Sequence, residues 1–260
     1  MFIPLYDSNR LRFIKRQYVT YGLILVNILV FIFTSLGVSE TVANADILGM
    51  GYIPAVLHNY AYLAPEDYII PQNWTYITYA FLHADVYHIG GNMLFLWVFG
   101  DNVEDALGHF RFLIFYLACA VAGAFLHGVI VPDSETPLIG ASGAIAGVIA
   151  AYLILTPRVK LWVLAFMWFP VRIPAYIPLI LWVGFQFLML INQTEDEVSW
   201  PCHVGGIIAG AILVVLMRRK GVPLFDKNHS EEMVDASPTL IIPAPLPLEP
   251  ASPSKWGRPE

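Results

Sequence analysis

The sequence predicts an all-α polytopic membrane protein, a bundle of six transmembrane helices with an outer loop partly embedded in the membrane. Hydrophobic residues make up 57% of the 260-residue chain and charged residues only 13%, whereas about a quarter of the residues of soluble domains are charged. The mean hydropathy is +0.63. Because the charges are bunched between long apolar runs, the composition excludes an ordinary soluble protein.

Six apolar runs supply the helices in chain order. They cover residues 18–36, 88–99 with the helix continuing to about 107, 112–131, 142–155, 175–191 and 203–217. A helix needs about 20 residues to cross a hydrocarbon layer about 30 Å thick. The first, third and fifth runs meet or approach this length, and the other three are short. The short runs begin with His88, Ser142 and His203.

Basic residues predict the orientation of these helices. Alternating from the N-terminus places all 14 Lys and Arg residues on one side, which the positive-inside rule identifies as cytoplasmic. The outer segments 38–87, 132–141 and 192–202 contain no Lys or Arg and carry ten of the 20 acidic residues. We therefore expect both termini in the cytoplasm.

The remaining segments are assigned by length and composition. The outer segment 38–87 is rich in Tyr and Trp, so we expect it to lie partly in the membrane as short helices. The apolar segment 161–169 is too short to span and is predicted as an interfacial or buried loop. Residues 1–17 form a basic cytoplasmic N-terminus and 18–217 the six-helix domain. Residues 218–260 are predicted to be a disordered, Pro-rich cytoplasmic tail.

The polar residues that open the short runs are predicted to lie at one depth. Counting from the cytoplasmic ends places Ser142, His203 and His88 about 20–22 Å above the inner surface, and so roughly 8–10 Å below the outer one. Asn92, one turn below His88 on the same helix face, can reach the same place. Polar residues at this depth are costly and usually functional. Helices that start so deep predict a wet pocket open to the outside.

Small residues predict how the fourth and sixth helices pack. Gly143 and Gly147 lie one turn apart on the fourth run, as do Gly206 and Gly210 on the sixth. Such faces let two helix backbones approach closely in lipid. If the two faces meet, the serine and the histidine at the heads of these runs meet as well. Gly143 also leaves the serine backbone N–H accessible, as an oxyanion donor must be.

Taken singly, each of these polar residues has a structural explanation. Ser142 could cap its helix, and His203 could be a hydrogen-bonded packing residue. His83, His88 and Asn92 could form an interfacial hydrogen-bonding cluster. Their combination at one depth is what favours a reaction centre.

Other polar residues indicate structure rather than chemistry. Glu104, in Gly100-x3-Glu104-x3-Gly108, fits a buried hydrogen-bonding residue better than a catalyst. Cys119 and Cys202 lack the spacing of a zinc or redox site. We predict no metal, no cofactor, and neither a nucleotide nor a nucleic acid as partner.

Five motifs occur in a fixed order within residues 18–217. They are Trp74-Thr75, His83-x4-His88-x3-Asn92, Gly100-x3-Glu104-x3-Gly108, Gly140-Ala141-Ser142-Gly143-x3-Gly147 and His203-x2-Gly206-x3-Gly210. In order, spacing and position this set resembles the rhomboid family of intramembrane serine proteases. The resemblance implies that Ser142 is the nucleophile and His203 the general base, without an acidic third member. It also implies that His88 and Asn92 assist the oxyanion hole, with His83 in support.

The resemblance further implies that the substrates are other membrane proteins, cut near the outer end of a transmembrane helix. A plain six-span core with both ends inside looks most like an enzyme of a bacterial inner membrane. Two departures are modest: Thr75 stands where the family often has Arg, and Cys202 where it usually has Ala. Neither removes a catalytic group.

Two other classes of function compete with this prediction. An inactive relative that binds membrane clients typically lacks the Ser or the His, and both are present here. A channel or transporter would need polar residues along a path to the inner face. Below Ser142 and His203 the fourth and sixth runs offer only apolar residues with a few Tyr, Thr or Met.

Overall fold

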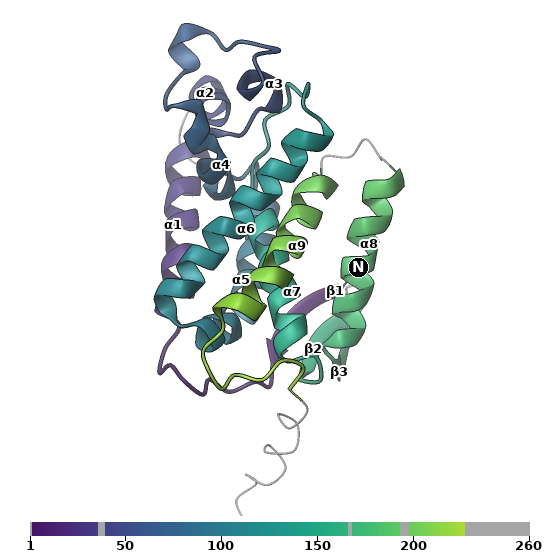
Figure 1. The fold of residues 1–260 in the computed structure, drawn as a ribbon. Helices are drawn as coiled ribbons and strands as arrows, with labels where there is room; N and C mark the ends of the chain where they lie inside the picture. Colours follow the sequence, from purple (N-terminus) through teal and green to yellow (C-terminus); the bar gives the residue numbers. More distant parts are fainter. Residues whose placement is uncertain (1, 36–39, 166–167, 193–197, 227–260) are drawn as a thin grey trace, which may run out of the picture.

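The computed structural model describes residues 2–35, 40–165, 168–192 and 198–226. Its frame is a bundle of six long helices, which correspond to the six predicted runs (Figure 1). They are α1 (Tyr18–Ser35), α5 (Val86–Leu107), α6 (His109–Ile130), α7 (Ser142–Leu155), α8 (Tyr176–Asn192) and α9 (Trp200–Met217). By length and composition α6 and α9 could each cross a membrane, and α1, α7 and α8 are shorter apolar helices.

Helix α7 forms the centre of the bundle. Nearly all of its side chains are buried, and α5, α6, α8 and α9 all contact it. Its many Gly and Ala residues allow this crowding, because small side chains let neighbouring backbones approach. In contrast, large apolar side chains stay exposed on α1, α6, α8 and α9, among them Phe33, Phe125, Leu181 and Leu216. Such a broad apolar surface is typical of a protein that meets lipid.

Short helices cover one end of the bundle, which we call the serine end because α7 begins there with Ser142 (Figure 1). They are α2 (Glu40–Met50), α3 (Pro54–Leu57), η1 (Pro65–Asp67), η2 (Gln72–Trp74), α4 (Thr75–Thr78) and η3 (Tyr79–Phe81). Tyr52 and Leu138 join this layer to the loop before α7 through a pair of backbone hydrogen bonds of 3.1 and 2.8 Å. The predicted short helices of the outer segment are therefore present.

The prediction of an all-α protein is wrong in one region. Strands β1 (Phe2–Asp7), β2 (Lys160–Ala165) and β3 (Phe169–Pro174) form an antiparallel sheet in the order β1-β2-β3. We call this end of the bundle the sheet end. The segment predicted as a loop pairs because it alternates: Leu161 and Val163 are buried, while Trp162 between them is exposed. This two-residue period is that of a half-buried strand.

The chain beyond α9 also packs at the sheet end. The N–H groups of Phe225 and Asp226 donate to the carbonyls of Ile154 and Leu155, at 2.7 and 3.0 Å. These carbonyls belong to the last turn of α7 and have no partner within the helix. The predicted tail began at residue 218, so its first part, to 226, is ordered against the bundle. The rest of it, 227–260, lies outside the described residues.

Candidate functional site

Ser142 is the first residue of α7 and remains partly exposed, although its neighbours Ala141 and Gly143 are buried. The turn before it depends on Gly140, whose φ of +113° disfavours any residue with a side chain. The N–H of Gly140 donates to the carbonyl of Tyr79 at 2.9 Å. The backbone entering the serine is thus held by η3 in the outer layer.

Two predicted site residues, His88 and Asn92, pack against Gly140. A methyl group at this position would overlap the imidazole of His88 and touch the side-chain nitrogen of Asn92. Both residues therefore lie against the backbone that leads into Ser142. The two predicted motifs that carry these residues, one entering α5 and one at the start of α7, therefore meet at the serine end.

His83 supports this group from the loop before α5. The Asn92 amide nitrogen donates to His83 Nε2 at 3.0 Å, and the His83 and His88 rings meet edge to face, with their centroids 5.1 Å apart. Burial, reinforced by the charge of His88, lowers the pKa of His83 to about 4. His83 is therefore neutral near pH 7 and can accept the hydrogen bond that fixes the Asn92 amide.

Asp85 is the N-cap residue that immediately precedes α5, and it therefore helps to set the position of His88. Its carboxylate accepts hydrogen bonds from the N–H groups of Tyr87 and His88, at 2.7 and 2.9 Å. These are N–H groups of the first turn, which an N-cap side chain normally satisfies. The bond from the His88 N–H is the main cause that lowers the pKa of Asp85. Asp85 is thus ionised at neutral pH and acts as a helix cap.

His203 lies in the first turn of α9 and is only 9% exposed. Its Nδ1 lies 2.8 Å from Oε1 of Gln186 on α8. The rings of Trp200 and Trp182 flank it, with centroids 6.1 and 6.2 Å from that of the imidazole. The imidazole is therefore held on one side by an amide and confined by two indoles.

Contacts between glycines place Ser142 and His203 at the same end of one helix pair. A methyl group on Gly206 would overlap the Gly143 carbonyl, and one on Gly210 would overlap the Gly147 carbonyl. The backbones of α7 and α9 are thus in direct contact over two turns. The serine immediately precedes the first of these contacts, and the histidine lies one turn before it. The small-residue face of α7 therefore meets the small-residue face of α9.

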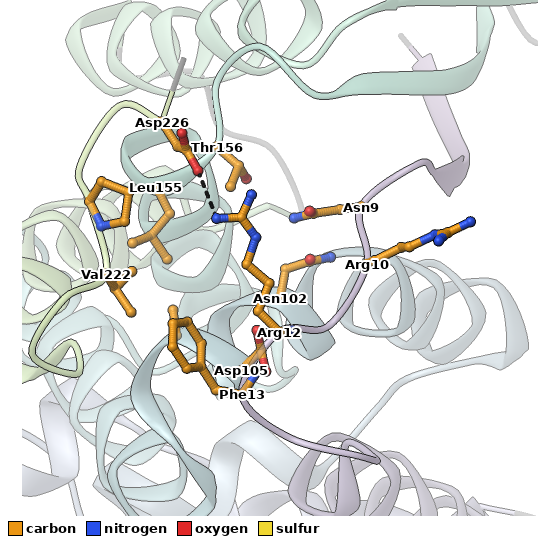
Figure 2. Close-up of a pocket in the computed structure, with 12 residues that line it drawn as sticks. Asn9, Arg10, Arg12, Phe13, Asn102, Asp105, Leu155, Thr156, Val222 and Asp226 are labelled. Atoms are coloured by element: carbon orange, nitrogen blue, oxygen red, sulfur yellow. Dashed lines mark hydrogen bonds and ion pairs between the residues drawn. The ribbon is translucent and has the colours of Figure 1, made fainter. Parts of the chain in front are cut away.

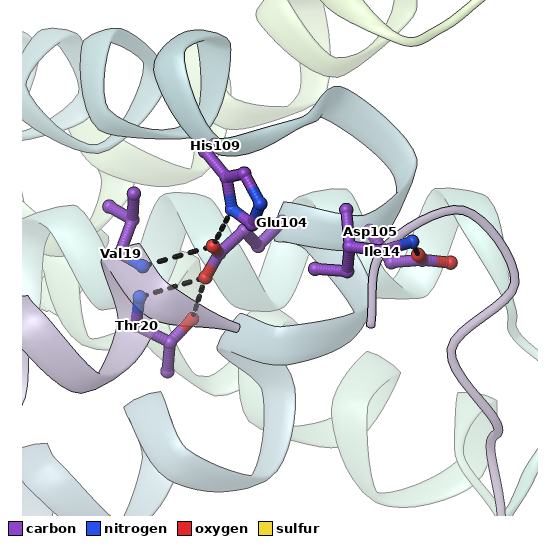
Figure 3. A network of polar contacts seen from close by, with 6 residues as sticks. All are labelled: Ile14, Val19, Thr20, Glu104, Asp105 and His109. Atoms are coloured by element: carbon purple, nitrogen blue, oxygen red, sulfur yellow. Dashed lines mark hydrogen bonds and ion pairs between the residues drawn. The ribbon is translucent and has the colours of Figure 1, made fainter. Parts of the chain in front are cut away.

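Glu104 lies at the sheet end, 16 residues after His88 on α5 and so about 24 Å away along the helix. Figure 3 shows its carboxylate beside the start of α1. It accepts hydrogen bonds from the N–H groups of Val19 and Thr20, at 3.0 and 2.8 Å, from the Thr20 hydroxyl and from His109. These contacts are those of a structural residue that caps α1.

Asp105 is a second anchor that the sequence did not single out. Its carboxylate accepts hydrogen bonds from three successive N–H groups, those of Arg12, Phe13 and Ile14, at 2.7 to 2.8 Å. The signal in the sequence that could have indicated this anchor is its position directly after Glu104. Together the two carboxylates attach the N-terminal segment to the end of α5.

A small cavity also opens at the sheet end. Its lining includes Asn102, Asp105 and Leu155, and an ion pair of 3.4 Å joins Arg12 to Asp226 across it (Figure 2). The opposite end of α7, about 20 Å away, carries the predicted nucleophile. The cavity therefore lies between the N-terminal segment and the segment that follows α9, and it is separate from the predicted reaction centre.

Gln186 is the residue near His203 that sequence reasoning missed. It is the one amide within the apolar run 175–191, and a polar residue in such a run often marks function. That signal was present, although the sequence does not say which way the side chain points. As for metal ions, no group of three or more His, Cys, Asp or Glu side chains within the described ranges could hold one.

The chain matches the family model of the Rhomboid domain over residues 71–220. It is 31% identical over 182 residues to "Rhomboid protein 1, mitochondrial" of Saccharomyces cerevisiae, which covers 65% of this chain and 49% of that protein. It is 31% identical to "RHOMBOID-like protein 12, mitochondrial" of Arabidopsis thaliana, over 56% of this chain and 46% of the relative. The identity to "Rhomboid protease GluP" of Bacillus subtilis is 32%, over 58% and 27%. The matched regions thus span half or less of these relatives.

Proposed function

The chain belongs to the rhomboid family and is therefore an integral membrane protein; from this premise we propose that it is an intramembrane serine endopeptidase. The proposed catalytic pair is Ser142 and His203. The observation that carries the proposal is the backbone contact of α7 and α9 at Gly143 and Gly206, directly below the two residues. A relative with 32% identity, from Bacillus subtilis, is named a rhomboid protease.

In the proposed mechanism Ser142 Oγ attacks the carbonyl carbon of a peptide bond. A serine hydroxyl is a weak nucleophile until a base removes its proton, and neutral His203 can act as this base near pH 7. The protonated histidine then gives the proton to the leaving amine as the tetrahedral intermediate collapses to an acyl-enzyme. Water, activated by the same histidine, releases the product and restores the serine.

The negative charge on the carbonyl oxygen needs hydrogen-bond donors. We propose the Ser142 backbone N–H, the Asn92 amide and His88 for this role, because preorganised donors lower the barrier most in a low-dielectric site. The packing of His88 and Asn92 against Gly140 supports this assignment. Gly143 keeps the serine N–H accessible, and His83 fixes the Asn92 amide through their hydrogen bond.

The proposed substrates are transmembrane helices of other proteins, cut near the outer membrane face. An intact helix hides its carbonyls in hydrogen bonds, so the cut segment must unwind locally. We therefore expect helix-breaking and small residues at the cleavage site to favour the reaction. This assignment uses no cofactor, nucleotide or nucleic acid.

The proposed topology has six spans, with both termini on the side that carries the basic residues. In a bacterial inner membrane that side is the cytoplasm. Two of the similar relatives are named as mitochondrial and one is bacterial. The two sides of the membrane are therefore defined by the basic residues and not by a compartment. Arg10 and Lys220, which lie near the two ends of the bundle sequence, mark that side.

The proposal is tested by cleavage of a reporter transmembrane substrate with purified protein in detergent. Ser142→Ala and His203→Ala should both abolish cleavage while thermal unfolding remains close to that of the wild type. Ser134→Ala, a serine in the loop before α7 and outside the proposed pair, is the matched control and should retain cleavage. Cleavage that survives Ser142→Ala in a protease-free preparation would refute the mechanism.

A further inference from the structure

We propose that Gln186 is a positioning residue, which fixes the tautomer and the ring orientation of His203. The inference rests on the proposed function, because tautomer matters to a base that must accept a proton from serine. It concerns a different residue from the proposed pair, on a different helix. A tautomer can also be measured without any substrate.

The orientation of the Gln186 amide follows from its two hydrogen bonds. Its side chain is 2% exposed, so both ends of the amide need partners within the protein. Its nitrogen donates to the carbonyl of Trp182, one turn earlier on α8, at 3.1 Å. The amide oxygen is thereby turned toward His203 Nδ1, at 2.8 Å.

This geometry allows one tautomer of neutral His203. An amide oxygen can only accept a hydrogen bond, so the proton must be on Nδ1. Nε2 then carries the lone pair that a general base needs. Trp182 and Trp200 confine the ring on its other sides, so rotation that would exchange the two nitrogens is opposed by packing.

Gln186 thus does part of what an aspartate does in a Ser-His-Asp triad. In those proteases the acidic residue holds the imidazole in the correct tautomer and also stabilises its charged form. The amide supplies the first effect without a buried negative charge. Removal of the Gln186 amide oxygen should allow both tautomers of His203, because a neutral imidazole without a partner at Nδ1 can carry its proton on either nitrogen.

Three variants separate positioning from packing. Gln186→Met keeps the length of the side chain and removes the acceptor oxygen. Gln186→Glu restores an acceptor, since a protonated carboxyl group can donate to the Trp182 carbonyl and accept from Nδ1. Leu179→Met changes a buried residue elsewhere on α8 at nearly constant volume and serves as the control.

The first measurement is nitrogen NMR of protein labelled with ¹⁵N-histidine, at a pH where His203 is neutral. The signals of His203 are identified by their absence in His203→Ala. In the wild type and in Leu179→Met, we expect Nδ1 protonated and Nε2 bare. Gln186→Met should give a mixture of tautomers, and Gln186→Glu should return the wild-type pattern.

The second measurement is the rate of reporter cleavage. Gln186→Met should lower kcat on the order of 10- to 1,000-fold with little change in KM, which is below the loss of about 10⁴-fold caused by a wrong tautomer in a Ser-His-Asp protease. Gln186→Glu should recover most of the rate. A wild-type His203 protonated on Nε2, or a Gln186→Met protein with unchanged tautomer and kcat, would overturn the inference. A wild type that cleaves nothing would count against the proposed function alone, because the NMR result decides the role of Gln186 separately.

Discussion

Individual glycines decide how close the two proposed catalytic helices can come. At Gly206 any side chain would meet the carbonyl of Gly143, which is rigid backbone and belongs to the residue after Ser142. We predict that Gly206→Ala forces α7 and α9 apart at the serine end. The expected result is a loss of about 1–3 kcal/mol in the free energy of unfolding, the usual cost of overpacking, together with loss of reporter cleavage.

Gly184→Ala on α8 is the matched control for this prediction. A methyl group there would meet nothing within 4 Å, and alanine is the better helix former by about 1 kcal/mol. Unfolding in detergent and cleavage are measured for both variants. Equal stability and activity of the two proteins would show that the contact between α7 and α9 is looser than the geometry indicates.

At the level of elements, the sequence predicted the long helices well and the sheet not at all. The apolar runs located α1, α5, α6, α7, α8 and α9 within a few residues, because an uninterrupted apolar stretch has few other stable folds in lipid. The alternation of the segment 161–169 and the neighbouring strand β3 were local signals for β2, whereas its other pairing partner, β1, lies more than 150 residues earlier in the chain. Nothing local in the segment 161–169 specifies that partner.

The same reasoning explains what could be predicted of the candidate site. The depth argument and the glycine spacings brought Ser142 and His203 to one end of two helices. Gln186 could not be found in this way, since the facing of a side chain on α8 depends on how that helix packs against α9. Single polar residues within apolar runs should therefore be treated as candidates even when no motif contains them.

Strand β1 carries a buried carboxylate that should make stability depend on pH. Asp7 is 5% exposed, and its carboxylate accepts hydrogen bonds of 2.8 Å from Tyr152 on α7 and from Asn102 on α5. Burial raises its pKa from 3.8 to about 6, and these hydrogen bonds offset the effect only in part. The folded protein therefore binds this proton more tightly than the unfolded chain does.

It follows that Asp7 lowers the free energy of unfolding as pH rises from about 4 to about 6, with little further change above. The loss across this range should be on the order of 3 kcal/mol. We predict that Asp7→Asn removes this part of the pH dependence, as measured by unfolding in detergent between pH 4.5 and 7.5. Asp133→Asn, in an exposed loop at the serine end, is the control. An unchanged slope in Asp7→Asn would mean that Asp7 is ionised throughout.

Considered as a whole, the molecule separates its two tasks between its two ends. The serine end holds the proposed chemistry under a layer of short helices. The sheet end ties the N-terminal segment to the bundle through Glu104, Asp105 and the strand carrying Asp7, and it ties the segment after α9 through the N–H groups of Phe225 and Asp226. The intervening distance is about 20 Å, the length of α7. Substitutions at the sheet end should therefore change stability more than the rate of the folded enzyme.

This two-ended arrangement makes the proposed topology testable with single cysteines. Asp133 lies in the loop at the serine end and Lys220 follows α9 at the sheet end, and both are exposed. We predict that Asp133→Cys and Lys220→Cys react with a membrane-impermeant maleimide from opposite sides of intact, sealed membranes. The native thiols of Cys119 and Cys202 are 0% and 1% exposed and should contribute little labelling, which the wild type checks. Because Asp133 and Lys220 are separated by three proposed spans, labelling of both from one side would require an even number of crossings between them. That result would exclude the six-span topology and, with it, the assignment of Ser142 to the face opposite the basic residues.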